Sequence, residues 1–188
     1  MAHEEKIHGF MESLVIADKH LIGDLMAHKG IWTAGTSAVN NSYKALNTLV
    51  DAGRLEKGDG YFRIPGCLSE YKIHSQLLTK SLADIIKLNI DYKILREKSV
   101  PTINLRPDAL VLLTKGNRNL CIIIEVCNNE FPEFLQQKVN SWRQYDGVLD
   151  TLSLLFGTRI KAFDIVVSGD ITAEGTFELN QYLKEVSA

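Results

Sequence analysis

The sequence has few of the residues that hold together small secreted or metal-stabilised domains. Its three cysteines are an odd number in scattered apolar surroundings, so we expect no framework of disulfides. This cysteine usage favours a reducing compartment, the cytoplasm. A structural zinc site is not expected either, because there is no CxxC pair and the five histidines are dispersed.

Long apolar runs are absent as well. No run approaches the roughly 18 residues that a membrane-spanning helix needs. Residues 1–6 (MAHEEK) are polar and lack the apolar core of a signal peptide. The sequence therefore predicts a protein without membrane association. Its 188 residues are enough for one domain, or for two small domains with a core each.

The sequence also lacks a large excess of charge of one sign. Its formal net charge of −2 does not by itself indicate a nucleic-acid-binding protein. The charges are unevenly distributed, however. Lys and Arg outnumber Asp and Glu in residues 67–118, and the reverse holds in residues 119–188. The basic segment fits either a surface that contacts phosphate groups or an ordinary solvated face.

The first third of the chain is expected to be helical. Apolar residues recur at helical spacing over residues 4–17, 19–28 and 36–52, with Asp18 as the expected N-cap of the second helix. The side of the third helix that we expect to be buried carries Val39, Tyr43, Leu46, Leu49 and Val50.

A short hairpin is predicted next, over residues 54–64, because Asp59-Gly60 separates two short segments with apolar residues. Three helices followed by a small hairpin is the layout of a winged helix. The run ALNTLVDAGRLEKGDGYFRI (Ala45–Ile64) resembles the end of the recognition helix and the wing of winged-helix DNA-binding domains. The resemblance implies that the third helix enters the major groove of duplex DNA.

The DNA-binding residues that this resemblance implies come from two places. The outward face of the third helix would present Ser37, Asn40, Asn41, Lys44 and Asn47. The predicted wing and its flank would add Arg54, Lys57 and Arg63. Asn side chains read adenine edges and Lys contacts phosphate, so the residue types suit DNA. Winged helices also serve as dimerisation or protein-docking modules, and that alternative stays open.

Pro65-Gly66 marks the expected domain boundary, because together these residues break both helix and strand. We therefore expect domains at 1–66 and 67–188. In the second, the patterns predict a helix over residues 69–88, three strands, a long helix from Pro132, a further strand and a C-terminal helix over residues 177–186.

Two carboxylates stand out in the middle of this second domain. The apolar runs Ala109–Leu113 and Cys121–Val126 read as the buried strands of one antiparallel hairpin. Asp108 begins the first strand and Glu125 lies near the end of the second, so the hairpin brings them together. A carboxylate in such a strand is costly unless it is paired or binds a cation. Oxygen ligands of this kind suit Mg²⁺ or Mn²⁺.

Pro107-Asp108 followed by Glu125-Val126-Cys127 resembles the PD-(D/E)XK nuclease superfamily. The resemblance implies an α/β (α+β) fold, in which an N-terminal winged helix-turn-helix precedes an αβββαβ restriction-endonuclease-like core. It implies that Asp108 and Glu125 hold the metal, with Glu70 from the preceding helix as a third ligand. Cys127 stands where the family has its catalytic Lys, and Lys138 in the next helix is the candidate replacement. Glu70 has a plainer interpretation, as an acid that complements a helix dipole.

A winged helix followed by a nuclease-like core without the motif Lys also resembles replication-relaxation proteins of plasmids and phages. That resemblance implies a DNA-binding protein that acts in replication or its control, with double-stranded DNA as partner. Two other hypotheses stay open: an active Mg²⁺- or Mn²⁺-dependent endonuclease, and a module that binds a replication or transposition protein rather than DNA. A homodimer is expected if the protein reads a palindrome.

Overall fold

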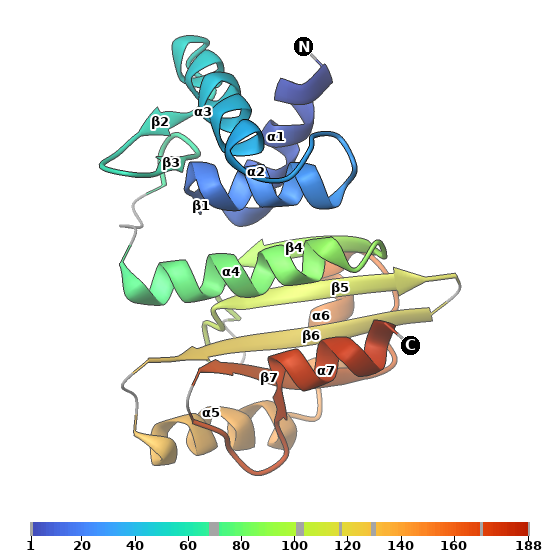
Figure 1. The fold of residues 1–188 in the computed structure, drawn as a ribbon. Coiled ribbons are helices and arrows are strands. Elements are labelled where there is room, and N and C mark those ends of the chain that lie inside the picture. The colour runs from blue at the N-terminus through green and yellow to red at the C-terminus, as the bar shows by residue number, and fades with distance from the viewer. Residues whose placement is uncertain are drawn as a thin grey trace. The chain divides into compact units, whose positions relative to one another are not determined.

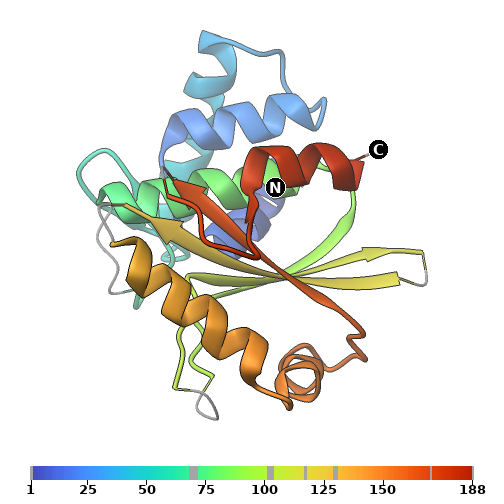
Figure 2. The same ribbon diagram turned by 90° about the horizontal axis from the view of Figure 1, so that it is seen from below.

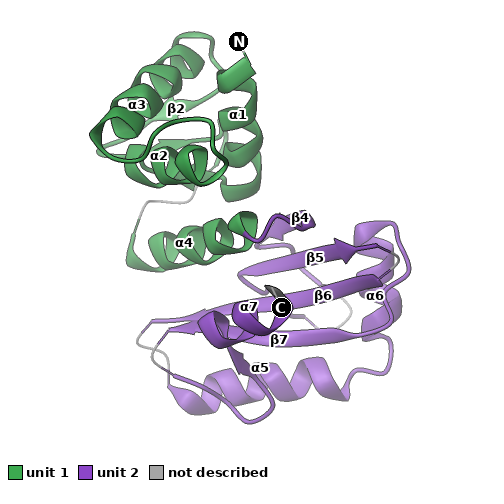
Figure 3. Ribbon diagram, turned by 45° about the vertical axis from the view of Figure 1, so that its right-hand side comes forward, with its two compact units in different colours: residues 1–87 green, residues 88–188 purple. Residues whose placement is uncertain are grey.

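The computed structural model describes residues 2–67, 72–100, 104–116, 118–128, 131–169 and 171–187. The chain forms two compact units, residues 1–87 and 88–188 (Figure 3). Both contain helices and strands, which confirms the mixed α/β class. The division lies between Lys87 and Leu88, whereas the sequence predicted it at residues 66/67. In the part of the chain that is described, no helix is long and apolar enough to cross a membrane.

The described part of the first unit holds four helices and a small antiparallel sheet in the order β1-β3-β2 (Figure 1). The elements are α1 (Ala2–Leu14), β1 (Ile16–Ala17), α2 (Lys19–His28), α3 (Thr36–Asp51), β2 (Glu56–Lys57), β3 (Phe62–Arg63) and α4 (Ile73–Lys87). This order of helices and hairpin is the one that the winged-helix interpretation requires; the interpretation itself stays a prediction.

Helix α2 begins where the sequence places its cap. The Asp18 carboxylate accepts hydrogen bonds from the backbone N–H groups of His20 and Leu21, at 2.8 and 2.9 Å. Helix α2 then packs closely on α3, because Gly23 has no side chain. A Cβ at Gly23 would lie 3.2 Å from the backbone of Ala38.

Helix α4 belongs to the first unit because polar contacts tie it to the other helices and to β1. The buried hydroxyl of Thr79 donates to the carbonyl of Ile16 at 3.1 Å. At the other end of α4, His28 Nε2 lies 2.9 Å from the carbonyl oxygen of Lys87. These contacts explain why the compact unit extends to the end of α4 rather than stopping at the Pro65-Gly66 turn.

The second unit is built on a five-stranded sheet in the order β4-β5-β6-β7-β8. Its elements are β4 (Asp91–Arg96), β5 (Ala109–Lys115), β6 (Arg118–Cys127), α5 (Pro132–Gln144), α6 (Val148–Phe156), β7 (Phe163–Gly169), β8 (Phe177–Glu178) and α7 (Leu179–Ser187). Strands β4, β5 and β6 are antiparallel, and β7 runs parallel to β6. The predicted central hairpin is therefore present.

Helices cover both faces of this sheet (Figure 2). Leu135, Val139 and Trp142 of α5 form one apolar cluster with alternate residues of the strands, such as Leu110 and Ile123. On the opposite face the hydroxyl of α7 residue Tyr182 donates to Asp164 Oδ2 at 2.6 Å. Burial and this hydrogen bond raise the pKa of Tyr182 well above its usual range.

Three local predictions differ from the structure. The helix expected to run unbroken from Pro132 to about Leu149 ends at Gln144, and α6 begins after Gly147. Residues 16–17, expected at the end of the first helix, form strand β1 and pair with β3. Residues 177–178, expected to start the last helix, form strand β8 and pair with β7. These two dipeptides are strands because they pair with other strands of the chain, β3 and β7. Local periodicity does not reveal such pairing.

The N-cap of α2 can be tested by substitution. Asp18→Ala removes the acceptor of two backbone hydrogen bonds and should lower the free energy of unfolding by about 1 kcal/mol. Asp24→Ala is the matched control, since Asp24 is exposed inside the same helix and Ala is a good helix former. Urea denaturation followed by circular dichroism measures both. Equal stability of the two variants would contradict the capping role.

Candidate functional site

Asp108 and Glu125 lie at one end of the sheet of the second unit. Ala109 pairs with Ile124 across the antiparallel β5–β6 ladder, so Asp108 and Glu125 are the next residues on the two strands. Leu110 and Ile123, also paired, belong to the cluster that α5 covers. Since side chains alternate between the faces of a strand, Asp108 and Glu125 are on that same face. The structure thus brings the two predicted carboxylates together.

Asp108 closes the β5–β6 ladder with its side chain. Its Oδ2 accepts a hydrogen bond from the backbone N–H of Val126 at 2.7 Å, and the residue is half-buried. One carboxylate oxygen is thereby held at the end of the strand pair.

Glu125 is a buried acid in the middle strand, with 2% of its surface exposed. Its Oε2 lies 3.2 Å from Nζ of Lys138, which reaches it from α5. The Lys138 side chain is 31% exposed, so the pair connects the interior of the sheet to solvent. Lys138, the candidate replacement for the motif Lys, therefore contacts Glu125, the predicted metal ligand.

Cys127, at the position of the missing motif Lys, points into the apolar cluster between the sheet and α5. It faces Gly169 of β7, where an added Cβ would lie 2.1 Å from the carbonyl oxygen of Cys127. Gly169 has φ 141°, a conformation that glycine adopts readily. Strands β6 and β7 thus approach closely beside Glu125. The other cysteine of β6, Cys121, is also buried, and burial raises its pKa to about 12.

The residues present meet the minimum for a hard divalent cation. Mg²⁺ is commonly held by one or two carboxylates together with water and substrate phosphates. Asp108 and Glu125 supply two carboxylates, although Glu125 is already paired with Lys138. Among the described residues no three His, Cys, Asp or Glu side chains gather in a group that suits a metal. Glu70, the predicted third ligand, lies outside the described residues.

The predicted DNA-binding residues of α3 are distributed between its exposed and half-buried positions. Ser37, Asn40 and Lys44 are exposed, and Asn41 and Asn47 are half-buried. Asn41 and Lys44 also line an open pocket of about 320 Å³ with Trp32. The opposite side of α3 is packed against the unit through Ala38, Ser42, Ala45, Leu46 and Leu49. The helix therefore presents a polar outer face, as the sequence predicts.

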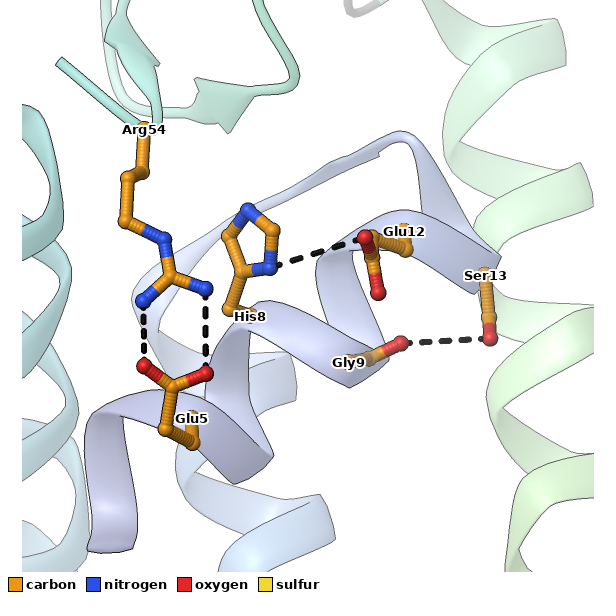
Figure 4. A network of polar contacts seen from close by, with 6 residues as sticks. All are labelled: Glu5, His8, Gly9, Glu12, Ser13 and Arg54. Atoms are coloured by element: carbon orange, nitrogen blue, oxygen red, sulfur yellow. Dashed lines mark hydrogen bonds and ion pairs between the residues drawn. The ribbon is translucent and has the colours of Figure 1, made fainter. Parts of the chain in front are cut away.

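Two of the predicted wing residues are engaged in ion pairs. Both terminal guanidinium nitrogens of Arg54 donate to the Glu5 carboxylate of α1, the longer contact measuring 3.1 Å (Figure 4). Arg54 thereby lowers the pKa of Glu5. Arg63 Nε donates to Glu56 Oε2 at 2.8 Å. The positive charges of these two arginines are thus balanced locally, which the linear sequence does not reveal.

Lys57, the remaining wing residue, forms a cluster with Tyr43 and Lys19. The sequence predicted Tyr43 to be buried and did not indicate Lys19. Its Nζ donates to the hydroxyl of Tyr43 at 3.0 Å and to Asn47 Oδ1 at 3.3 Å. Lys19 Nζ lies 5.2 Å from the centre of the Tyr43 ring. Tyr43 was predicted to be buried but is 40% exposed, and its ring makes a T-shaped contact with the buried ring of Phe62 in the hairpin.

Lys57 also changes the chemistry of Tyr43. Its hydrogen bond and its positive charge lower the pKa of the phenol. Lys19, Tyr43, Lys57, Tyr61 and Phe62 surround a small pocket of about 160 Å³. The cluster therefore combines two cations with an exposed aromatic ring beside the outer face of α3.

The Lys138–Glu125 pair makes a testable contribution to stability. Lys138→Met should lower the free energy of unfolding by about 2 kcal/mol, because it leaves the Glu125 charge buried without this cation. Combining it with Glu125→Gln should restore part of the loss. Lys184→Met, at an exposed lysine of α7, is the control and should change little. Guanidinium denaturation measures the wild type, the single variants Lys138→Met and Glu125→Gln, their combination and the control. Full additivity in the double variant would rule out the coupling.

Comparison with known proteins adds little to this geometry. No protein-family model matches the chain, and no curated protein sequence does. Among solved structures, the chain is similar to the restriction endonuclease FokI, with a TM-score of 0.26 and 12% sequence identity. The match covers 99% of this chain and 41% of that protein, so the chain spans about two fifths of its length. A TM-score this low carries no argument about function.

Proposed function

We propose that the chain is a DNA-binding protein that docks the outer face of α3 on duplex DNA, with the β2–β3 hairpin beside it. The observation that carries the proposal is the cluster of Lys19, Tyr43 and Lys57 next to this face. An α-helix fits the major groove, where Asn side chains recognise adenine and Lys contacts the flanking phosphates.

The exposure and the ion pairs of each predicted residue decide which role it would have in DNA binding. Exposed Ser37 and Asn40 would reach base edges, and Lys44 and Lys57 would contact phosphates. Lys19, at the start of α2, would contact the same backbone through its ammonium group. Arg54 and Arg63 would contribute less, because Glu5 and Glu56 already neutralise them. Replication or its control in a plasmid or phage is the setting that we propose for this binding.

Salt-dependent binding tests this proposal. We expect Lys44→Gln and Lys57→Gln to weaken binding of a duplex, and each to reduce the slope of log affinity against log salt by about 1. Lys6→Gln is the control, since Lys6 is an exposed lysine of α1 that is not among the residues proposed to contact DNA. Fluorescence anisotropy at 50–200 mM salt is the measurement. Absence of duplex binding by the wild type at low salt would refute the proposal and favour the protein-docking alternative.

A second function, metal-dependent cleavage of DNA, is favoured by the contact between Lys138 and Glu125. Asp108 and Glu125 would hold Mg²⁺ or Mn²⁺, which when bound supplies a Lewis acid and lowers the pKa of water. Lys138 would stabilise negative charge that develops on a phosphate. The backbone N–H of Val126 would keep Asp108 oriented. This set of roles leaves Cys127 without a part in the chemistry.

Cleavage of supercoiled, linear and single-stranded DNA with Mn²⁺ tests the second function. Asp108→Asn is the sharp variant, because its amide oxygen still accepts the Val126 N–H while the charge is lost. We expect a drop in rate of about a hundredfold or more if this carboxylate binds the metal. Asp150→Asn, at an exposed carboxylate of α6, should cleave at the wild-type rate. Equal cleavage by all three proteins would indicate a contaminating nuclease.

A further inference from the structure

A second polar site lies at the far end of the β6 strand. Arg118 begins this strand, and Arg159 and Lys161 follow α6 on the way to β7. Together with Asn119 and Leu120 they line a pocket of about 360 Å³. Seven residues separate Arg118 from Glu125 along the strand, which corresponds to roughly 23 Å. The pocket is therefore distinct from the candidate cleavage site.

Among the residues that the structure describes, the three cations of this pocket have no acidic partner. Within the described residues, no carboxylate lies at ion-pair distance from the side chains of Arg118, Arg159 or Lys161. This differs from the first unit, where Arg54 and Arg63 are each paired with a Glu. The three like charges repel one another. An anion bound among them would be attracted by all three and would reduce this repulsion.

The backbone around the pocket is held in place by a side-chain network. Asn119 Nδ2 donates to Thr158 Oγ1 at 3.1 Å and to the carbonyl of Arg159 at 3.3 Å, and its Oδ1 accepts from Thr114 Oγ1 at 3.2 Å. On the other side of the loop, the N–H of Ile160 donates to Ser153 Oγ at 2.9 Å. The segment that carries Arg159 is thus fixed to the hairpin before any ligand arrives.

The pocket also has room and an apolar wall for more than a bare ion. Its volume is within the range of small-molecule sites, about 300–1,000 Å³. Half-buried Leu120 is part of its lining and supplies an apolar side chain. Guanidinium groups are suited to phosphate because their planar N–H groups bind two oxygens at once. Phosphate monoesters carry a charge between −1.5 and −2 near neutral pH, which complements three cations.

We propose that Arg118, Arg159 and Lys161 form a binding site for a phosphate monoester carried on an organic group of nucleotide size. The phosphate lies among the three cations and the organic group packs against Leu120. The same chemistry is offered by a free mononucleotide and by the 5′-phosphate at the end of a nucleic-acid strand. The site belongs to the second unit and does not depend on DNA binding by α3.

Calorimetric titration of the full chain with deoxyadenosine monophosphate tests the site. We expect saturable binding of this nucleotide, and no binding of deoxyadenosine, which lacks the phosphate. Arg159→Gln should weaken binding about tenfold or more, the equivalent of one charge-assisted hydrogen bond. Lys115→Gln is the matched control. Lys115 is an exposed cation that lies opposite Arg118 in the β5–β6 ladder, but it does not line the pocket.

A second titration separates the two sources of the phosphate. Short single strands with and without a 5′-phosphate are compared in wild type and Arg159→Gln. A preference for the phosphorylated strand that disappears in Arg159→Gln supports the site even if the mononucleotide binds poorly. Absence of binding by every phosphate compound would overturn the proposal, as would equal weakening by Lys115→Gln and Arg159→Gln. The preference is the ratio of the affinities for the two strands, so it does not depend on duplex binding by α3.

Discussion

The buried carboxylate of Glu125 is the constraint to which the sheet of the second unit must adapt. Strand β6 is central and its neighbours are apolar, so an isolated charge there would be costly. Lys138 of α5 supplies a cation 3.2 Å from this carboxylate. A buried ion pair adds little stability over apolar residues of similar volume. The pair is therefore not explained by its contribution to stability alone.

Much of this second unit could be predicted from sequence because its signals are local or nearly so. The two apolar runs from Ala109 and Cys121 form the expected hairpin, and the hairpin alone brings Asp108 beside Glu125. The contact of Lys138 with Glu125 depends on how α5 packs, so sequence could only nominate it. The break between α5 and α6 was missed because Tyr145 and Asp146 do not by themselves stop a helix, and the apolar spacing continues across them.

The first unit shows why lists of charged residues predict binding surfaces poorly. Arg54 and Arg63 were predicted from the resemblance to a winged helix, yet each forms an ion pair with a Glu on another element. Tyr43 was assigned to the core from its helical spacing, although its side chain lies at the surface and only the hairpin residue Phe62 beside it is buried. Lys19, the cation beside the Tyr43 ring, comes from a different helix and is not part of any sequence motif. Only tertiary packing shows which charges remain available to a ligand.

The two ends of β6 also differ in whether their charges are balanced by a partner. At one end Glu125 is buried and its charge is balanced by Lys138, so any cation must compete with that ammonium group or share the carboxylate with it. At the other end Arg118 meets Arg159 and Lys161, and none of these three has a carboxylate beside it among the described residues. Binding of a cation at the first end requires rearrangement of an existing ion pair, whereas binding of an anion at the second end breaks no ion pair among the described residues. The uncompensated end is therefore where an anionic ligand gains most from electrostatic attraction.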